Sequence, residues 1–298
     1  WSCLQHTHAL KYYSEMRYTS PGPSAERLPK WTPRSWVAAY AAADSTLTLM
    51  TLEEKHHLLG GSAWTRISKL QGGPMPGYYM GNTPAIPRLR IPALKMHDAS
   101  NGFRILPHIP VGSSTSWPSL LAMAATWDAK LVEEVAHEIG VEFRGKGANV
   151  LLGPSIQVHR TALGGRNFEY LSGEDPYLGS VLARAYIRGV QSEGVMAVAK
   201  HWAMNEQETN RNWYSVNVHD ERIPMELYYP PFEAAIEEGV CAFMCAYNRV
   251  NGTYACHNPD LLTRDLRERL GFMGFVQSDW WANLGIPEAI LAGLDQEM

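Results

Sequence analysis

The residues with the clearest chemical potential lie near the C-terminus, at positions 275–281. An apolar run ends there at Ser278, and Asp279 follows it with the indoles of Trp280 and Trp281. A buried strand in this arrangement delivers a carboxylate to the solvent-facing end of a sheet, where it can act as a nucleophile. The alternative is an aspartate that opens a loop or caps the next helix. Whether Asp279 is a nucleophile or a loop residue depends on which other residues share its environment.

Other polar and aromatic side chains occupy the same kind of position, directly after an apolar run. Together with the first they are Asp98, Lys200 with His201, Tyr247 and Asp279. The C-terminal ends of parallel strands meet on one rim of a barrel, and barrel enzymes assemble their active sites on that rim. Four such strand ends therefore favour a functional site over four unrelated loop residues.

The elements that must position these residues alternate along the chain from residue 93. Strands are predicted at residues 93–97, 149–152, 195–199, 241–246 and 272–277. Helices are predicted at residues 36–43, 52–59 with Thr51 as the cap, 127–143, 176–191, 223–238 with an interruption near Pro230 and Pro231, 261–270 and 286–294. The alternation predicts an α/β fold with a parallel sheet under helices, and the length favours a TIM-type (β/α)8 barrel over an open sheet. Residues 1–46 are predicted to form an extended arm with the first helix, and residues 47–298 the barrel domain.

Composition argues against several classes of function. The 298 residues are 45% hydrophobic, enough for a sizeable core, and the net charge is −4 without any Lys/Arg-rich run. This balance argues against nucleic acid as a partner and suits neutral, polar substrates. No apolar run reaches the roughly 18 residues that a membrane span needs. Because the chain begins at Trp1 without a signal-peptide pattern, we expect it to start after processing or to be a fragment.

The spacing of cysteines and histidines gives no sign of a zinc site. Of the four cysteines, Cys245 and Cys256 flank the glycosylation sequon at Asn251. A disulfide between these two cysteines would close a short loop that carries a glycan, which would suit a secreted protein. Four free thiols are the alternative.

A loop at residues 160–175 is rich in charge. Arg160 and Arg166 flank a glycine pair, and Glu169 and Asp175 follow. We interpret Arg166, Glu169 and Asp175 as an ion-paired loop that positions the next helix. Arg160 could instead reach a hydroxyl of the substrate.

Several multi-residue motifs together carry a family resemblance. They lie at residues 81–89, 124–128, 200–208, 244–248, 274–280 and 292–298. In this order they resemble the barrel domain of glycoside hydrolase family 3, especially its fungal-type β-glucosidases, from about residue 47 to the end. The resemblance implies a retaining, exo-acting β-glycosidase that hydrolyses terminal β-D-glucosyl residues through a covalent glycosyl-aspartate. It also implies that no metal or organic cofactor is needed.

The resemblance assigns roles to individual positions. Asp279 matches the nucleophile and Tyr247 a tyrosine beside it, while Met244 matches a wall of the site and Trp280 an aromatic platform for a sugar face. The residues that would hold sugar hydroxyls in the first subsite are Asp98, Arg104, Arg160, Lys200 and His201. Charged groups suit this task, because a sugar that lacks the matching hydroxyl leaves a buried polar group unpaired.

The sequence departs from the family pattern in three places. After Asp98 the usual proline turn is replaced by residues 99–103, although Arg104 is kept, and His97 stands where glutamine is common. In the β-glucosidase type, the general acid/base comes from a C-terminal α/β sandwich domain. We expect the barrel to be truncated before that domain. The general acid/base is then not in this chain and comes from a missing domain or a partner chain.

Two alternative functions are compatible with the same residues. One is a non-catalytic carbohydrate-binding or structural subunit derived from the barrel. The other is a β-xylosidase or arabinofuranosidase, which the same rim would serve if the first subsite excluded a hydroxymethyl group. We expect the substrate to be a β-glucoside or an oligosaccharide and the protein to be secreted. We expect no nucleic-acid partner and no membrane span.

Overall fold

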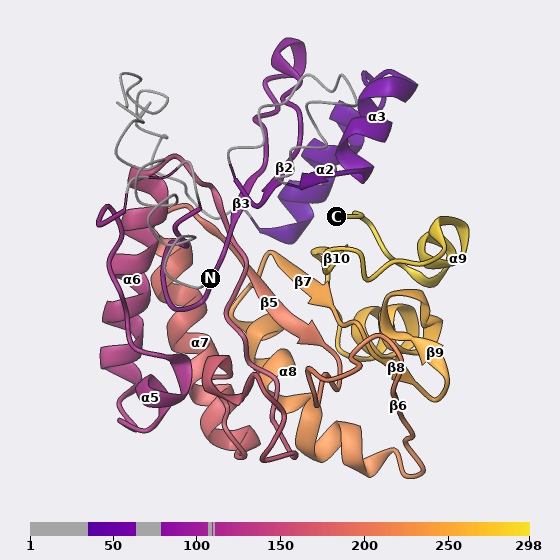
Figure 1. Cartoon of the computed structure of the whole chain (residues 1–298). Coiled ribbons are helices and arrows are strands. Elements are labelled where there is room, and N and C mark those ends of the chain that lie inside the picture. Colours follow the sequence, from indigo (N-terminus) through magenta and orange to yellow (C-terminus); the bar gives the residue numbers. More distant parts are fainter. Residues whose placement is uncertain (1–34, 64–78, 107–108, 110) are drawn as a thin grey trace, which may run out of the picture.

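A seven-stranded sheet forms the centre of the molecule (Figure 1). The computed structural model describes residues 35–63, 79–106, 109 and 111–298, so the predicted arm at residues 1–34 lies outside the described part. Strands β3, β4, β5, β7 and β10 run parallel, while β1 and β2 are antiparallel to their neighbours. The strand order is β1 (Ser62–Ala63), β2 (Gly81–Asn82), β3 (Lys95–His97), β4 (Val150–Leu151), β5 (Met196–Trp202), β7 (Ala242–Cys245) and β10 (Phe275–Ser278).

The predicted α/β class and the parallel core of the sheet are confirmed, but the sheet is curled and mixed rather than built of eight parallel strands. Strand β2 reaches β3 through residues 83–94, which contain only the 3-10 turn η1 (Pro87–Leu89) and no crossover helix. Parallel neighbours need such a crossover, whereas strands joined without one pair antiparallel. This connection explains why the first part of the sheet differs from the predicted barrel.

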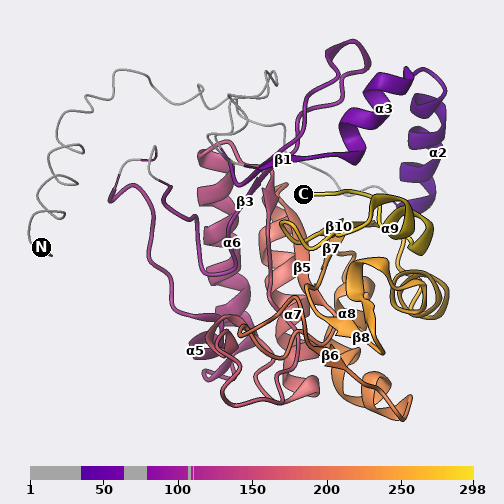
Figure 2. The same cartoon turned by 45° about the vertical axis from the view of Figure 1, so that its right-hand side comes forward.

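The last described residues extend the sheet beyond β10. After α9 (Ile286–Ala292) the chain turns back, and Gln296 forms a parallel bridge with Gln277 of β10. The next residue, Glu297, forms a second bridge with Gly60, just before β1. Figure 2 shows this segment lying between β10 and β1. Backbone pairing therefore connects the two edges of the sheet through residues 296–297.

The two longest described helices, α6 (Ala129–Gly145) and α7 (Pro176–Ser192), cover one face of the sheet together with the short α8 (Pro230–Glu237) (Figure 1). Asp128 caps α6 by accepting a hydrogen bond from Leu131 N, and Asp175 caps α7 by accepting from the N–H groups of Tyr177 and Leu178. Asp175 thus has the predicted role of positioning the following helix. Within the described residues, no helix is both long and apolar enough to cross a membrane.

Shorter elements surround this core. They are α2 (Trp36–Leu47), α3 (Leu52–Leu59), α5 (Leu120–Ala124), 3-10 turns at Asn167–Glu169 and Ala255–His257, and π-helical segments at Pro224–Tyr228 and Asp260–Arg269. The predicted cap of α3 is confirmed, because Thr51 and Glu54 form a reciprocal capping box. The helix predicted over residues 223–238 is interrupted at Tyr229, ahead of two prolines that cannot donate backbone hydrogen bonds.

A second, three-stranded sheet was not predicted. It consists of β6 (Ser215–Val216), β8 (Arg249–Val250) and β9 (Thr253–Tyr254). Each strand has two residues, which is too short for an alternating pattern to be recognised. This small sheet supports the loops that follow β5 and β7.

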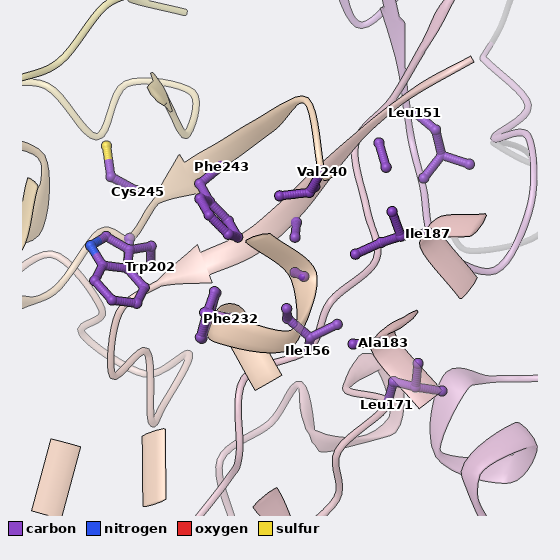
Figure 3. Packing of buried hydrophobic residues seen from close by; sticks show 14 of the residues in the cluster. Leu151, Ile156, Leu171, Ala183, Ile187, Trp202, Phe232, Val240, Phe243 and Cys245 are labelled. Carbon is purple, nitrogen blue, oxygen red and sulfur yellow. The ribbon is translucent and has the colours of Figure 1, made fainter. Parts of the chain in front are cut away.

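Alternate side chains of the strands enter two separate apolar clusters. Phe243 of β7 lies under the helices with Trp202 and Phe232 (Figure 3). The next residue, Met244, points to the opposite face, into a smaller cluster that contains Trp280. Because side chains alternate along a strand, a strand that is buried on both faces reads as a continuous apolar run. The central strands were predictable for this reason.

Close packing of α6 against α7 depends on Gly189. A methyl group there would collide with the Glu133 carbonyl oxygen and lie 2.9 Å from Cβ of Ala136. We expect Gly189→Ala to lower the free energy of unfolding by about 1–3 kcal/mol through overpacking, although alanine has the higher helix propensity. Urea titrations followed by circular dichroism would measure the change.

Gly145→Ala is the matched control for this prediction. Gly189 lies in α7 and Gly145 in α6, and a methyl group at Gly145 would meet no heavy atom within 4 Å outside its own helix. This substitution should leave stability unchanged or raise it by up to about 1 kcal/mol. Equal effects of the two substitutions would show that α6 and α7 can separate without loss, contrary to the prediction.

Candidate active site

Asp279 follows β10 directly, and its side chain is almost buried, with 9% of the residue exposed. Its two carboxylate oxygens face different partners. The Tyr247 hydroxyl lies 3.1 Å from Oδ1 and also 2.7 Å from the Trp280 carbonyl oxygen, so its proton is shared between them. His201 Nε2 lies 3.3 Å from Oδ2. The strand-end residues Asp279, Tyr247 and His201 therefore meet as predicted.

Cations surround this carboxylate. Burial raises the pKa of Asp279 above its usual value, while the charges of Lys200, Arg166 and Arg211 and the Tyr247 hydroxyl oppose that rise. Lys200 is itself 4% exposed and precedes His201 in β5. A buried carboxylate can remain ionised only with such compensation. Asp279 is thus a carboxyl group whose ionisation depends on its neighbours.

His201 is fully buried between two polar partners. The Tyr170 hydroxyl lies 2.5 Å from its Nδ1, on the side opposite Asp279. Burial, and then the charges of Arg166 and Lys200, hold the pKa of His201 well below its usual value. The imidazole is therefore neutral at neutral pH and carries one proton.

The loop after β4 contributes Arg166 to the site. Arg166 forms the expected ion pair with Glu169, but its Nη2 also lies 3.4 Å from His201 Nε2, and its charge acts on Asp279. Arg160 lies elsewhere: its side chain contacts the Tyr228 hydroxyl at 3.5 Å. The structure therefore brings Arg166 into the group and leaves Arg160 out of it.

Asp98 and Arg104 form an ion pair at 2.9 Å on the rim. They line a cavity of about 550 Å³ together with Arg166, Phe168, Glu169 and Lys200. The unusual His97 supports this corner: its Nδ1 accepts a hydrogen bond from Met80 N, and its Nε2 lies 2.7 Å from the Arg104 carbonyl oxygen. With Nδ1 as acceptor, Nε2 carries the proton and donates it to Arg104. His97 thus ties the loop after Asp98 back to β3 without the proline turn.

Met244 and Trp280 lie beneath the site. They are 2% and 6% exposed, and both belong to the inner apolar cluster. Trp280 Nε1 donates to the Met80 carbonyl oxygen at 3.2 Å, which fixes the indole. The neighbouring Trp281 is 68% exposed.

Three residues around Asp279 were not predicted as part of the site: Arg166, Tyr170 and Arg211. The Arg211 guanidinium stacks on the Tyr247 ring, 3.7 Å from its centroid, and pairs with Glu208 at 3.0 Å. All three lie within loops that follow β4 or β5, several residues beyond the strand end. The sequence analysis selected only residues directly after an apolar run. Selecting whole loops after these runs would have included the three residues, but also many residues that lie away from Asp279.

Cys245 and Cys256 are joined by a disulfide in the structure, with their Cα atoms 5.3 Å apart. Cys245 ends β7, two residues before Tyr247. Between the two cysteines, Asn251 and Thr253 of the sequon are exposed, and Asn251 Oδ1 accepts a hydrogen bond from Val218 N at 2.7 Å. The disulfide therefore anchors the loop that carries both Tyr247 and the sequon.

The described residues contain no group of three or more histidine, cysteine or acidic side chains arranged to hold a metal ion. The carboxylates around the rim face cations instead. Glu169 pairs with Arg166, Glu208 with Arg211, and Asp98 with Arg104. The chemistry open to this site is that of a buried carboxylate with hydrogen-bond donors around it.

Residues 80–291 match the family model described as Glycosyl hydrolase family 3 N terminal domain. The chain is 45% identical over 258 residues to a beta-glucosidase from Rhizobium radiobacter, covering 86% of this chain and 29% of that protein. It is 39% identical over 275 residues to the probable beta-glucosidase M of Aspergillus fumigatus, covering 89% and 33%. The chain therefore spans about a third of the length of these relatives.

The chain is also similar to solved structures of beta-glucosidases. Beta-glucosidase 3B from Thermotoga neapolitana in complex with glucose superposes with a TM-score of 0.78 at 39% identity, over 86% of this chain and 36% of that one. The beta-D-glucoside glucohydrolase of Trichoderma reesei superposes with a TM-score of 0.80 at 37% identity, over 91% and 36%.

The disulfide makes a prediction about thiol reactivity. Before reduction, a thiol reagent added to the denatured protein should leave Cys245 and Cys256 unmodified, because both sulfurs are in the bond. After reduction, both should be modified. Mass spectrometry of the peptides would show this, with Cys241 as the internal control, since it is a free thiol in the structure. Modification of all three cysteines before reduction would contradict the disulfide.

Proposed function

Because the chain belongs to glycosyl hydrolase family 3, we propose that it forms the sugar-binding and nucleophilic part of a β-glucosidase. The observation that carries this proposal is the buried Asp279 carboxylate, which accepts a hydrogen bond from the Tyr247 hydroxyl, lies 3.3 Å from His201 Nε2 and is stabilised by the charges of three nearby cations. The substrate is a β-glucoside or an oligosaccharide with a terminal β-D-glucosyl residue. The names of the relatives support this choice of substrate.

In the proposed reaction, ionised Asp279 attacks the anomeric carbon. A bond forms between a carboxylate oxygen and that carbon while the bond to the leaving oxygen breaks, and the leaving oxygen takes a proton from a general acid. Water then gives up a proton to the same group, now acting as a base, and attacks the anomeric carbon. The bond to the Asp279 oxygen breaks, which releases the sugar with retained configuration and restores the carboxylate. Tyr247 and His201 orient the carboxylate for the first step, because the Tyr247 hydroxyl donates to Oδ1 and His201 Nε2 faces Oδ2.

The first subsite is proposed to lie against the strand ends. Asp98, Arg104 and Lys200 hold sugar hydroxyls there, and Arg166 takes the place expected of Arg160. His201, which was expected to hold a hydroxyl as well, instead positions Asp279, because its two ring nitrogens already face Tyr170 and Asp279. Met244 and Trp280 form its apolar floor. Ion-paired donors and acceptors that lie ready on the rim cost little to reorganise when the sugar binds.

The general acid is proposed to come from outside the described residues, in a second domain or a partner chain. Burial raises the pKa of Glu169, but the charges of Lys200 and Arg166, together with the hydrogen bond from Arg166, overcome this and leave the pKa lowered. Glu169 is therefore ionised and unsuited to donate a proton. Without a general acid, cleavage of unactivated substrates should slow by about 10²–10⁴-fold.

We also propose an extracellular location with a glycan on Asn251. The disulfide between Cys245 and Cys256 and the exposed sequon support this, because disulfides persist in oxidising compartments.

The nucleophile can be tested without the general acid. A 2-deoxy-2-fluoro-β-glucoside with an activated leaving group should add one sugar mass to the chain, because its leaving group needs no proton. Intact mass spectrometry should show this adduct on the wild type and none on Asp279→Asn. A family member known to be labelled serves as the positive control. If that control reacts and the wild type does not, the chain is a non-catalytic carbohydrate-binding or structural subunit.

The electrostatic environment of Asp279 predicts the pH dependence of that labelling. The nucleophile must be ionised, so the labelling rate should fall as the pH drops through the raised pKa of Asp279. Arg211 lowers this pKa, so Arg211→Met should move the acid limb to higher pH, by up to roughly one unit. Arg222→Met is the matched control, since Arg222 forms an exposed ion pair with Glu226. A shift to lower pH, or equal shifts in both variants, would contradict this assignment.

A further inference from the structure

The hydroxyl of Tyr170 has a single acceptor for its proton among the described residues. Two polar groups contact this hydroxyl: His201 Nδ1 at 2.5 Å, and the Asn205 amide, whose Nδ2 donates to it at 3.4 Å. Asn205 Nδ2 is a donor and cannot accept the phenolic proton. Burial raises the pKa of Tyr170 well above its usual value, so the phenol keeps that proton. The proton of Tyr170 is therefore directed to His201 Nδ1.

The other nitrogen of His201 faces two groups with opposite requirements. Asp279 Oδ2 lies 3.3 Å from Nε2 and can only accept a hydrogen bond. Arg166 Nη2 lies 3.4 Å from the same nitrogen and can only donate one. A proton on Nε2 satisfies Asp279, whereas a lone pair there satisfies Arg166 and repels the carboxylate. The orientation of Asp279 thus depends on which nitrogen carries the proton.

We propose that Tyr170 is a positioning residue that fixes His201 in the tautomer with its proton on Nε2, directed at Asp279. Its effect on catalysis rests on the proposed function, whereas the tautomer itself does not. In this state the Asp279 carboxylate receives one donor on each oxygen, from Tyr247 and from His201. Arg166 keeps its ion pair with Glu169 through Nε, and its Nη2, 3.4 Å from His201 Nε2, then meets no lone pair on that nitrogen.

The doubly protonated ring is disfavoured by the same arrangement. An imidazolium would donate from both nitrogens, and the Tyr170 proton would lose its acceptor in a buried site. An unpaired buried donor is costly. The neighbouring charges of Arg166 and Lys200 also oppose a second positive charge on His201. Tyr170 therefore selects one of three protonation states of the ring.

Nuclear magnetic resonance can read this state directly. The 298-residue chain labelled with ¹⁵N-histidine would be studied by long-range ¹H–¹⁵N correlation, with His201→Gln identifying the His201 signals. We expect an unprotonated, hydrogen-bonded Nδ1 and a protonated Nε2 at neutral pH. In Tyr170→Phe, Arg166 can compete for Nε2, so the ring should populate both tautomers and its two nitrogen shifts should move towards each other.

Tyr186→Phe is the matched control. Tyr186 is equally buried, and its hydroxyl donates to the Ser100 carbonyl oxygen, away from His201. This variant should leave the His201 signals unchanged. A wild-type ring with its proton on Nδ1 would overturn the proposal. A Tyr170→Phe ring that keeps its proton wholly on Nε2 would also overturn it, because Asp279 alone would then set the tautomer.

The labelling assay separates this inference from the proposed function. Tyr170→Phe should slow formation of the glycosyl-enzyme by roughly tenfold or more, as expected when a buried acceptor loses its donor. The fluoroglucoside concentration that gives half of the maximal labelling rate should change less. Tyr186→Phe should react like the wild type. If the wild type is not labelled, the proposed function fails and the tautomer result still stands. If it is labelled and Tyr170→Phe reacts at the same rate, the inference fails alone.

Discussion

The charge of Asp279 is the constraint on which the rest of the site depends. A carboxylate that is almost buried at the end of β10 would become protonated unless nearby groups compensated for its lost hydration. Strand β5 supplies Lys200 and His201, the end of β7 supplies Tyr247, and the loops after β4 and β5 supply Arg166 and Arg211. No local segment could provide all of these groups. The parallel sheet is the device that gathers them, because its strands end on the same rim.

The compensating cations are themselves balanced, which keeps the site from becoming a strongly positive cavity. Arg166 pairs with Glu169, and Arg211 pairs with Glu208 while stacking on the Tyr247 ring. Each arginine therefore has a fixed place before any sugar arrives. A network held in this way needs little rearrangement during the reaction, which is the main source of electrostatic catalysis in enzymes. Tyr247 connects Arg211 with Asp279, since the Arg211 guanidinium stacks on its ring and its hydroxyl contacts the Asp279 carboxylate.

The sequence was informative where a residue's place follows from a strand, and uninformative where it follows from the path of a loop. Lys200, His201 and Asp279 could be placed because apolar runs buried on two faces mark the central strands clearly. Arg160 and Arg166 lie six residues apart around a glycine pair, and spacing alone could not decide which would turn towards the sheet. The antiparallel β2 was unpredictable for a related reason, since its two residues carry no alternating pattern and its pairing partner is set by tertiary structure.

For the proposed reaction, the same cations that favour the ionised form of Asp279 argue that the general acid belongs to another structural element. A retaining glycosidase needs a protonated carboxyl group about 5–5.5 Å from the nucleophile, on the opposite face of the sugar. Glu169 shows how strongly these cations favour the ionised form of a nearby carboxyl group, because its pKa is lowered although it is buried. A general acid that has to stay protonated is therefore better placed where the sugar separates it from Lys200, Arg166 and Arg211. In the proposed reaction, a nucleophile at the strand ends of the sheet and an acid on a separate domain or chain would resolve this conflict, since each carboxyl group would then have its own electrostatic environment.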